Sequence, residues 1–265
     1  MRRMSLRALV CTGLVWVGVL DAAGQGRNGP LEAMSVDGKR VRIVFPVEAM
    51  HVSRDATRIL KVLEDILAQE APAYGFPDAF VWDRRVTVGL GTEAGTPSST
   101  AKSVPRDALI IVHANSVRSL DASQLRRLLR HEAAHLLVGE LLDYRATPRW
   151  LQEGFAEWFA GGLTCDGEFR LWIELRRRSA ADEELPRLDD ASWAVLPSRL
   201  AYDFFGSFFE FLEHRHPGLV SDGDLLERVK LDGAFVADSW EAQWHEYLRR
   251  KSHREPVCTL RSEAR

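Results

Sequence analysis

The chain has 265 residues, of which 46% are hydrophobic and 28% are charged. This is the composition of an ordinary globular protein that builds one sizeable core, or two small lobes that share a cleft. The formal net charge of −3 argues against a nucleic-acid-binding surface, so we expect no nucleic acid partner.

Residues 1–24 have the features of a secretory signal peptide. A basic start with Arg2, Arg3 and Arg7 precedes a largely apolar stretch over residues 8–20, and Ala22-Ala23-Gly24 offers small residues for cleavage. The apolar stretch is too short to span a bilayer comfortably. We therefore expect an exported protein, periplasmic or extracellular, without a stable membrane span.

The next part of the chain predicts a small mixed sheet and one long helix. Residues 25–40 lack periodicity and are expected to form a flexible mature N-terminus. The hydrophobic pattern predicts strands over residues 41–46, 86–90 and 108–112, and a helix over residues 53–75. Residues 91–105 are rich in Gly, Ser, Thr and Pro and are interpreted as a loop.

A helix predicted over residues 124–142 carries the sequence His131-Glu132-Ala133-Ala134-His135. Residues four apart stack on one face of a helix, so His131 and His135 present two imidazoles side by side. Two neutral imidazoles at this spacing can hold a divalent metal, and Glu132 can take a proton from water that the metal activates. The alternative is a chance match on a histidine-bearing helix, because the pattern fixes only three residues.

The following helix offers the ligand that this pair lacks. Thr147 is expected to cap the helix and Pro148 to be its first residue. Glu153 supplies a third ligand if the two helices pack together, and Gly154 favours a close approach. Glu157 lies one turn further on and can accept the free ring N–H of a ligating histidine. The alternative is two acids on a solvated face.

The two motifs together resemble the gluzincin metallopeptidases. HExxH at residues 131–135 is followed by Trp-Leu-x-Glu-Gly-x-Ala-x-Trp at residues 150–158, a pairing found in thermolysin-like enzymes, aminopeptidases and small bacterial peptidase MA-like domains. The connection is one residue shorter here than in the aminopeptidases. The resemblance implies a zincin-like fold, a peptide or protein substrate and a Zn²⁺ ion. The implied roles are zinc ligation by His131, His135 and Glu153, general base catalysis by Glu132, and contact with a ligating histidine by Glu157.

In gluzincins a small sheet forms the upper lip of the cleft, and its edge strand can pair with an extended substrate backbone. By order in the chain, residues 108–112 are the expected edge strand.

The remainder of the chain is mostly helical in pattern. Residues 169–178 are expected to form a short helix or strand, and residues 180–198 a crossover. An aromatic helix is predicted over residues 200–214, and the last helices over residues 225–230 and 240–250.

Tyr202 lies near the start of the aromatic helix, whose polar residues Asp203, Ser207 and Glu210 are expected opposite the aromatic face. Members of the gluzincin clan place a Tyr or His donor opposite the general base, so the resemblance suggests Tyr202 as the oxyanion donor. A core or capping tyrosine is an equal alternative.

Cleavage of the signal peptide would leave two cysteines, Cys165 and Cys258. An even pair in an oxidising compartment is more often a disulfide than two free thiols. We therefore expect a Cys165–Cys258 bridge.

Taken together, these patterns predict an α+β metallopeptidase domain over residues 41–255. It would comprise a sheet and metal-helix lobe over residues 41–142 and a helical lobe over residues 143–255. The expected reaction is zinc-dependent hydrolysis of peptide bonds. Two alternatives stay open: a non-catalytic, zinc-stabilised binding or scaffold protein, and a metal hydrolase that acts on a non-peptide substrate.

Overall fold

A computed structural model provides the structure of the chain. It describes residues 33–73, 85–91, 101–143, 145–222, 224–226, 229 and 237–257. The predicted signal peptide lies outside these residues. The described chain is an α+β protein, as the sequence predicts, with a mixed sheet and a larger helical content.

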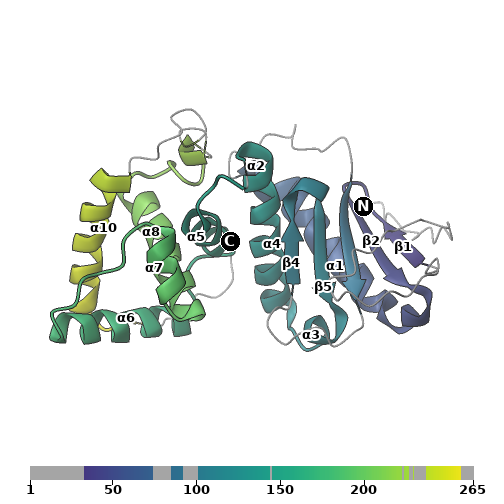
Figure 1. Cartoon of the computed structure of the whole chain (residues 1–265). Coiled ribbons are helices and arrows are strands. Elements are labelled where there is room, and N and C mark those ends of the chain that lie inside the picture. Colours follow the sequence, from purple (N-terminus) through teal and green to yellow (C-terminus); the bar gives the residue numbers. More distant parts are fainter. Residues whose placement is uncertain are drawn as a thin grey trace, which may run out of the picture.

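The sheet has five strands among the described residues, in the order β1-β2-β3-β5-β4 (Figure 1). The strands are β1 (Ala33–Asp37), β2 (Val41–Pro46), β3 (Val86–Gly91), β4 (Ala101–Val104) and β5 (Leu109–His113). Strands β2, β3 and β5 are parallel, and β1 and β4 attach antiparallel at the two outer positions.

Two of these strands correct the interpretation of the sequence. Strand β1 lies inside residues 25–40, which were expected to be flexible, and β4 lies inside residues 91–105, which were interpreted as a loop. Both are short and poor in β-branched residues, and their extended form depends on pairing with a longer neighbouring strand. As a consequence, β5 is an inner strand, and β4 is the edge of the sheet near the metal helix.

A long helical segment follows β2, close to the predicted residues 53–75. It consists of α1 (Ser53–Asp65), a π-helical turn (Ile66–Glu70) and α2 (Ala71–Ala73). The apolar stripe of α1 includes Ala56, Ile59 and Leu63, all fully buried, and α1 packs against β2 and against helix α4 (Ala122–Leu141). Helix α4 also packs against the edge strand β4, so it lies beside the sheet near that edge (Figure 1).

Helix α4 begins at a complete capping box. The Asp121 carboxylate accepts a hydrogen bond from the Gln124 backbone N–H, and the Gln124 side chain accepts one from the Asp121 backbone N–H. This cap explains why the helix begins two residues before the predicted start at residue 124.

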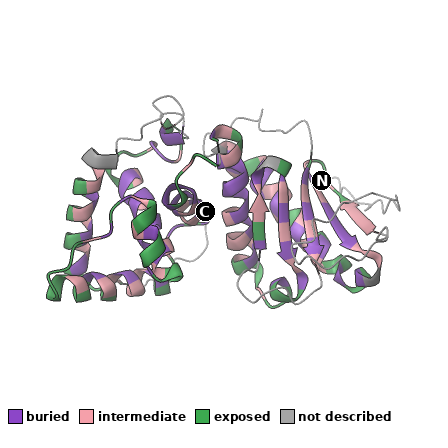
Figure 2. Cartoon of the chain, in the orientation of Figure 1, coloured by how far each residue is buried: buried purple, intermediate pink, exposed green. Residues whose placement is uncertain are grey.

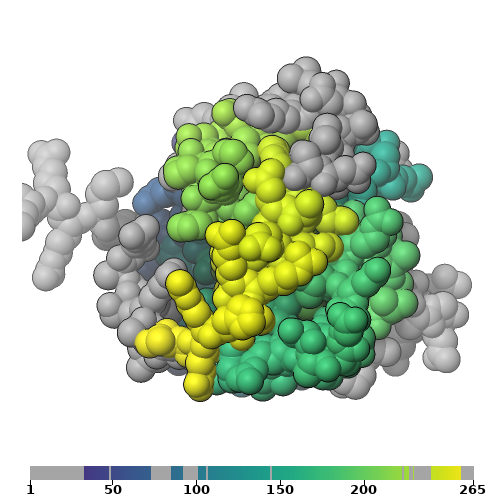
Figure 3. All heavy atoms as spheres, turned by 90° about the vertical axis from the view of Figure 1, so that its left-hand side faces the viewer, coloured from purple at the N-terminus to yellow at the C-terminus, as the bar shows by residue number. Residues whose placement is uncertain are grey.

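The rest of the described chain is helical and lies on the other side of α4 (Figure 1). Its helices are α5 (Arg149–Phe159), α6 (Cys165–Ala180), α7 (Asp190–Val195), α8 (Ser198–Arg215) and α10 (Ala237–Ser252). Seen from the helical end, α10 lies across the outer surface of this part, over α6 and α8 (Figure 3). Of the predicted helix over residues 225–230, residues 225, 226 and 229 are described, and they are helical.

Two details of the helical part differ from the prediction, and a third decides between helix and strand. Helix α5 begins at Arg149 with Pro148 at its N-cap, because the Thr147 hydroxyl donates to the Asp143 carbonyl instead of capping. The predicted crossover over residues 180–198 contains the short helix α7. Residues 169–178 are helical, within α6.

The aromatic helix α8 is buried on nearly all sides, and its polar residues are not on a solvated face. Asp203 is 2% exposed and binds Arg170 through both carboxylate oxygens, at 2.8 and 3.1 Å. Ser207 is fully buried, donates to the Phe204 carbonyl and accepts from the Trp244 indole N–H. Paired polar groups can be buried in this way because their hydrogen bonds replace those of water.

Gly154 permits close packing, but against α8 and not against α4. A Cβ atom at this position would lie 2.8 Å from the Phe205 carbonyl oxygen and 2.8 Å from a ring carbon of Phe209. The buried faces of α5 and α8 therefore approach each other directly (Figure 2). None of the helices in the described part of the chain is both long and apolar enough to cross a bilayer.

Candidate metal centre

The helices α4 and α5 bring three potential metal ligands together. His131 and His135 lie on one face of α4, as their spacing predicts, and Glu153 faces them from α5. The two Nε2 atoms are 3.3 Å apart, and the Glu153 Oε2 atom is 3.4 Å from each of them. The three donor atoms therefore form a nearly equilateral triangle.

The size of this triangle fits a tetrahedral metal ion. Zinc binds nitrogen and oxygen at about 2.0–2.1 Å, so the donors of a tetrahedral site lie about 3.3–3.4 Å apart. Six-coordinate magnesium, with donors at about 2.1 Å, would place neighbouring donors only about 3.0 Å apart and prefers oxygen. Among the described residues, Glu153 Oε2 is also a buried oxygen that accepts no hydrogen bond. The three side chains can thus hold a metal ion.

The charges within this cluster shift the pKa values of Glu153 and His131 in opposite directions. Burial alone would raise the pKa of Glu153, but the neighbouring His131 and His135 hold that pKa well below its ordinary value. Burial alone would lower the pKa of His131, but contact with Glu153 and the charges of Glu132 and Glu157 raise it. In the absence of a cation, His131 therefore tends to bind a proton where it would otherwise bind a metal.

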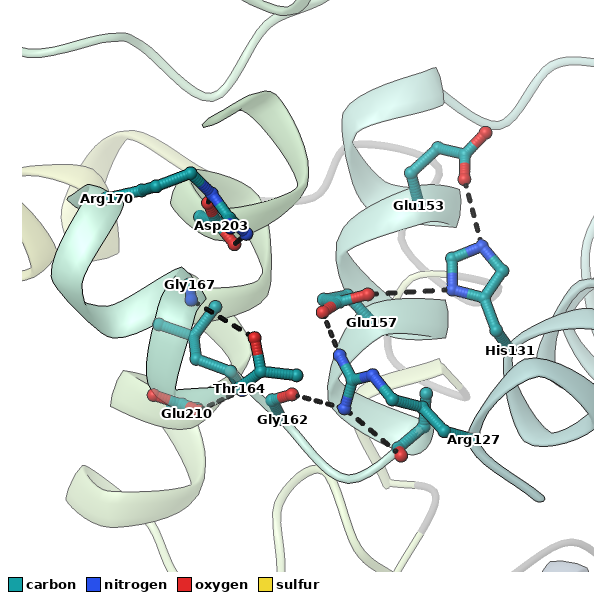
Figure 4. A network of polar contacts seen from close by, with 12 residues as sticks. Arg127, His131, Glu153, Glu157, Gly162, Thr164, Gly167, Arg170, Asp203 and Glu210 are labelled. Carbon is teal, nitrogen blue, oxygen red and sulfur yellow. Dashed lines mark hydrogen bonds and ion pairs between the residues drawn. The ribbon is translucent and has the colours of Figure 1, made fainter. Parts of the chain in front are cut away.

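Glu157 lies where the sequence analysis expects it, beside the second ring nitrogen of His131. One carboxylate oxygen is 3.8 Å from His131 Nδ1, while Nε2 of the same ring faces Glu153 (Figure 4). The other oxygen of Glu157 accepts a hydrogen bond from Arg127, whose guanidinium also donates to the Gly162 carbonyl at 2.8 Å. Arg127 thus holds Glu157 in place from α4, a role that the sequence pattern did not reveal.

Glu132 is buried, and it also has a partner that sequence reasoning missed. The Ser103 hydroxyl lies 2.5 Å from Glu132 Oε2 and 2.9 Å from the Glu132 backbone carbonyl. Ser103 belongs to β4, the strand that was interpreted as a loop, so the sequence offered no reason to place it near α4.

Tyr202 lies at the same site. Its ring centre is 5.8 Å from that of His131 and 5.1 Å from that of Trp193. Burial and the negative charge of Glu153 raise the pKa of Tyr202 to about 12, so its hydroxyl keeps its proton at neutral pH. Arg149, a further residue missed from the sequence, places its guanidinium Nε 3.7 Å from Glu153 Oε1.

No protein-family model matches this chain, and no curated protein matches its sequence. The site must therefore be interpreted from its own geometry and from the chemistry of its residues.

The predicted disulfide involves Cys165 and Cys258. Cys165 is the first residue of α6, whereas Cys258 is outside the described residues. The bridge therefore stays a prediction. The remaining predicted site residues, namely His131, Glu132, His135, Glu153, Glu157 and Tyr202, all lie around the meeting point of α4, α5 and α8.

Proposed function

We propose that the protein is a zinc-dependent metallopeptidase of the gluzincin type, with a zincin-like fold. The observation that supports this proposal most strongly is the triangle of His131, His135 and Glu153 donors beside Glu132. Three protein ligands leave one position of a tetrahedral ion for water or substrate, as catalytic zinc sites require. A purely structural zinc site usually has four protein ligands, and the described residues offer three.

Zinc at this site would polarise the scissile carbonyl and lower the pKa of a water molecule toward about 7. The residues of the chain supply the rest of the chemistry. Glu132 would accept the proton of the attacking water and return it to the leaving amine. Tyr202 would donate a hydrogen bond to the developing negative charge, and Glu157 would orient the His131 ring through its Nδ1.

A peptide substrate is favoured by the position of the sheet edge. Strand β4 is the outermost strand of the described sheet on the side of α4, and it contacts this helix. An extended peptide can add to such an edge through main-chain hydrogen bonds without reading every side chain. This role belongs to β4 in our proposal, in place of the residues 108–112 that the sequence suggested.

The predicted signal peptide remains part of the proposal, because it would place the enzyme outside the cytoplasm. Extracellular or periplasmic peptides would then be the substrates.

The decisive experiment compares purified wild-type protein with the Glu132→Gln variant. Metal content is measured together with cleavage of a mixed peptide library. We expect about one zinc per chain in both proteins, and a loss of turnover of at least about 10²-fold in the variant, because proton transfer is removed while the metal remains.

The same comparison separates the two alternatives. A scaffold protein would bind zinc but leave every peptide intact in both forms. A hydrolase of non-peptide substrates would also leave the peptides intact, but it would cleave simple esters, amides or phosphoesters in a manner that depends on Glu132.

A further inference from the structure

The edge strand β4 contacts the carboxylate of Glu132, the residue that we propose as the general base. The Ser103 hydroxyl is 2.5 Å from Glu132 Oε2 and 2.9 Å from the Glu132 carbonyl oxygen. A hydroxyl has a single hydrogen, so it donates to one acceptor at a time. The shorter contact has the length of a charge-assisted O–H···O⁻ bond, which is stronger than a bond to a neutral carbonyl.

The position of Ser103 is set by the sheet. Ser103 is paired opposite Ile110 of β5, and Ile110 is fully buried. Side chains alternate along a strand, so Ser103 shares a face with the buried Ala101, while the exposed Lys102 lies on the other face. The hydroxyl is therefore presented to α4 by a strand whose register is fixed by β5.

A glutamate side chain has several rotatable bonds, and an unrestrained carboxylate samples many orientations. Proton transfer requires one particular orientation, in which a carboxylate oxygen lies within hydrogen-bond reach of the attacking water. A donor on Oε2 restricts the orientation of the carboxylate, while its remaining lone pairs can still accept a proton.

We propose that Ser103 is a positioning residue for Glu132. It holds the carboxylate in the orientation from which the base acts, and it thereby couples the sheet edge to the chemistry of the site. This inference rests on the proposed peptidase function for its kinetic consequence, but its structural consequence can be measured separately.

The first test is a kinetic double-mutant cycle with Ser103→Ala, Glu132→Gln and the double variant. We expect Ser103→Ala to lower kcat about tenfold, with KM within about twofold and one zinc per chain retained. On the Glu132→Gln background the serine change should cause no further loss, because the base that it positions is already absent.

Three further variants make the test specific. Ser103→Thr keeps the hydroxyl and should restore most of the lost kcat. The matched control is Ser119→Ala, which removes an exposed serine hydroxyl that donates to the Ser116 carbonyl, and it should leave kcat unchanged. Ser103→Cys, with its weak donor, replaces the alanine variant if that protein does not fold. A normal kcat in Ser103→Ala, or an equal loss on the Glu132→Gln background, would overturn the proposal.

The second test does not need activity. A crystal structure of the zinc-loaded wild-type protein should show the Glu132 side chain in a single orientation. In the zinc-loaded Ser103→Ala protein, Glu132 should adopt a different orientation or several orientations, while His131 and His135 stay in place. An unchanged, single Glu132 orientation in the variant would refute positioning by Ser103. If the wild-type protein cleaves no peptide, the peptidase proposal fails, and these structures still decide whether Ser103 positions Glu132.

Discussion

Glu153 is the candidate ligand that comes from the second helix, and its contribution can be tested by metal content. Replacement of Glu153 by Ala should abolish stoichiometric zinc binding, because two imidazoles alone leave the tetrahedral site half open. Glu140→Ala is the matched control, since Glu140 is an exposed acid on α4. Metal analysis of the two purified proteins should give about zero and about one zinc per chain. Stoichiometric zinc in Glu153→Ala would remove Glu153 from the ligand set.

Protons should compete with the metal at mildly acidic pH. A ligating imidazole must be neutral, and the pKa of His131 lies above its ordinary value of 6.5 in the metal-free protein. Below that pKa, each tenfold rise in proton concentration costs about tenfold in apparent affinity. We expect zinc affinity, measured by competition with a chelator, to fall at least about tenfold between about pH 7.5 and 5.5. A pH-independent affinity over this range would contradict the role of His131.

Tyr202→Phe separates catalysis from packing. The hydroxyl would contact a charge that develops only in the transition state, so its loss should lower kcat by about 10²-fold and leave KM close to wild type. Zinc content and the melting temperature should stay unchanged, because the phenyl ring preserves the contacts with His131 and Trp193. A normal kcat, or a parallel loss of stability and activity, would assign Tyr202 to the core.

At the scale of elements, the contact of α5 with α8 fixes the position of Glu153. Gly154→Ala should destabilise the protein by about 1–3 kcal/mol, because the added methyl group meets the backbone carbonyl of Phe205, which cannot move aside easily. The gain of about 1 kcal/mol in helix propensity offsets part of the packing cost, which is larger over most of its range. Gly91→Ala is the control, since no atom of the described residues lies within 4 Å of a Cβ built there. Thermal unfolding of both variants measures the difference, and equal melting temperatures would contradict this packing.

The elements with strong periodicity were predictable, and the weakly patterned ones were not. The spacing of His131 and His135 fixed their shared helix face, and α1 and α8 were evident from their apolar stripes. Strand β4 was missed because a four-residue strand with Lys102 and Ser103 has no pattern of its own and depends on β5. Ser103 was therefore missed as well. Arg127 was missed for a different reason: its contact with Glu157 joins two helices, and periodicity within one helix carries no information about the other.

At the scale of the whole chain, the predicted bridge between Cys165 and Cys258 would tie the C-terminal tail to the start of α6. Mass spectrometry of the unreduced, exported protein should show the peptides that contain Cys165 and Cys258 linked to each other. Removal of such a bridge by a Cys258→Ser change should lower the melting temperature, since a long closed loop restricts the unfolded chain. Free thiols at both positions in the exported protein would refute the pairing and weaken the inference of export.

The candidate ligands are divided between a helix that packs on the sheet and a helix that packs on the aromatic core of α8. A cation at the site would therefore join the two halves of the molecule, and its binding energy would become part of their unfolding energy. At a free metal concentration of about 1,000 times Kd, this contribution is about 4 kcal/mol. With metal, heat absorption on unfolding should follow a single cooperative transition. After chelation, the packing of α4 against α5 alone would couple the helices beyond residue 143 to the sheet, so the transition should move to a lower temperature.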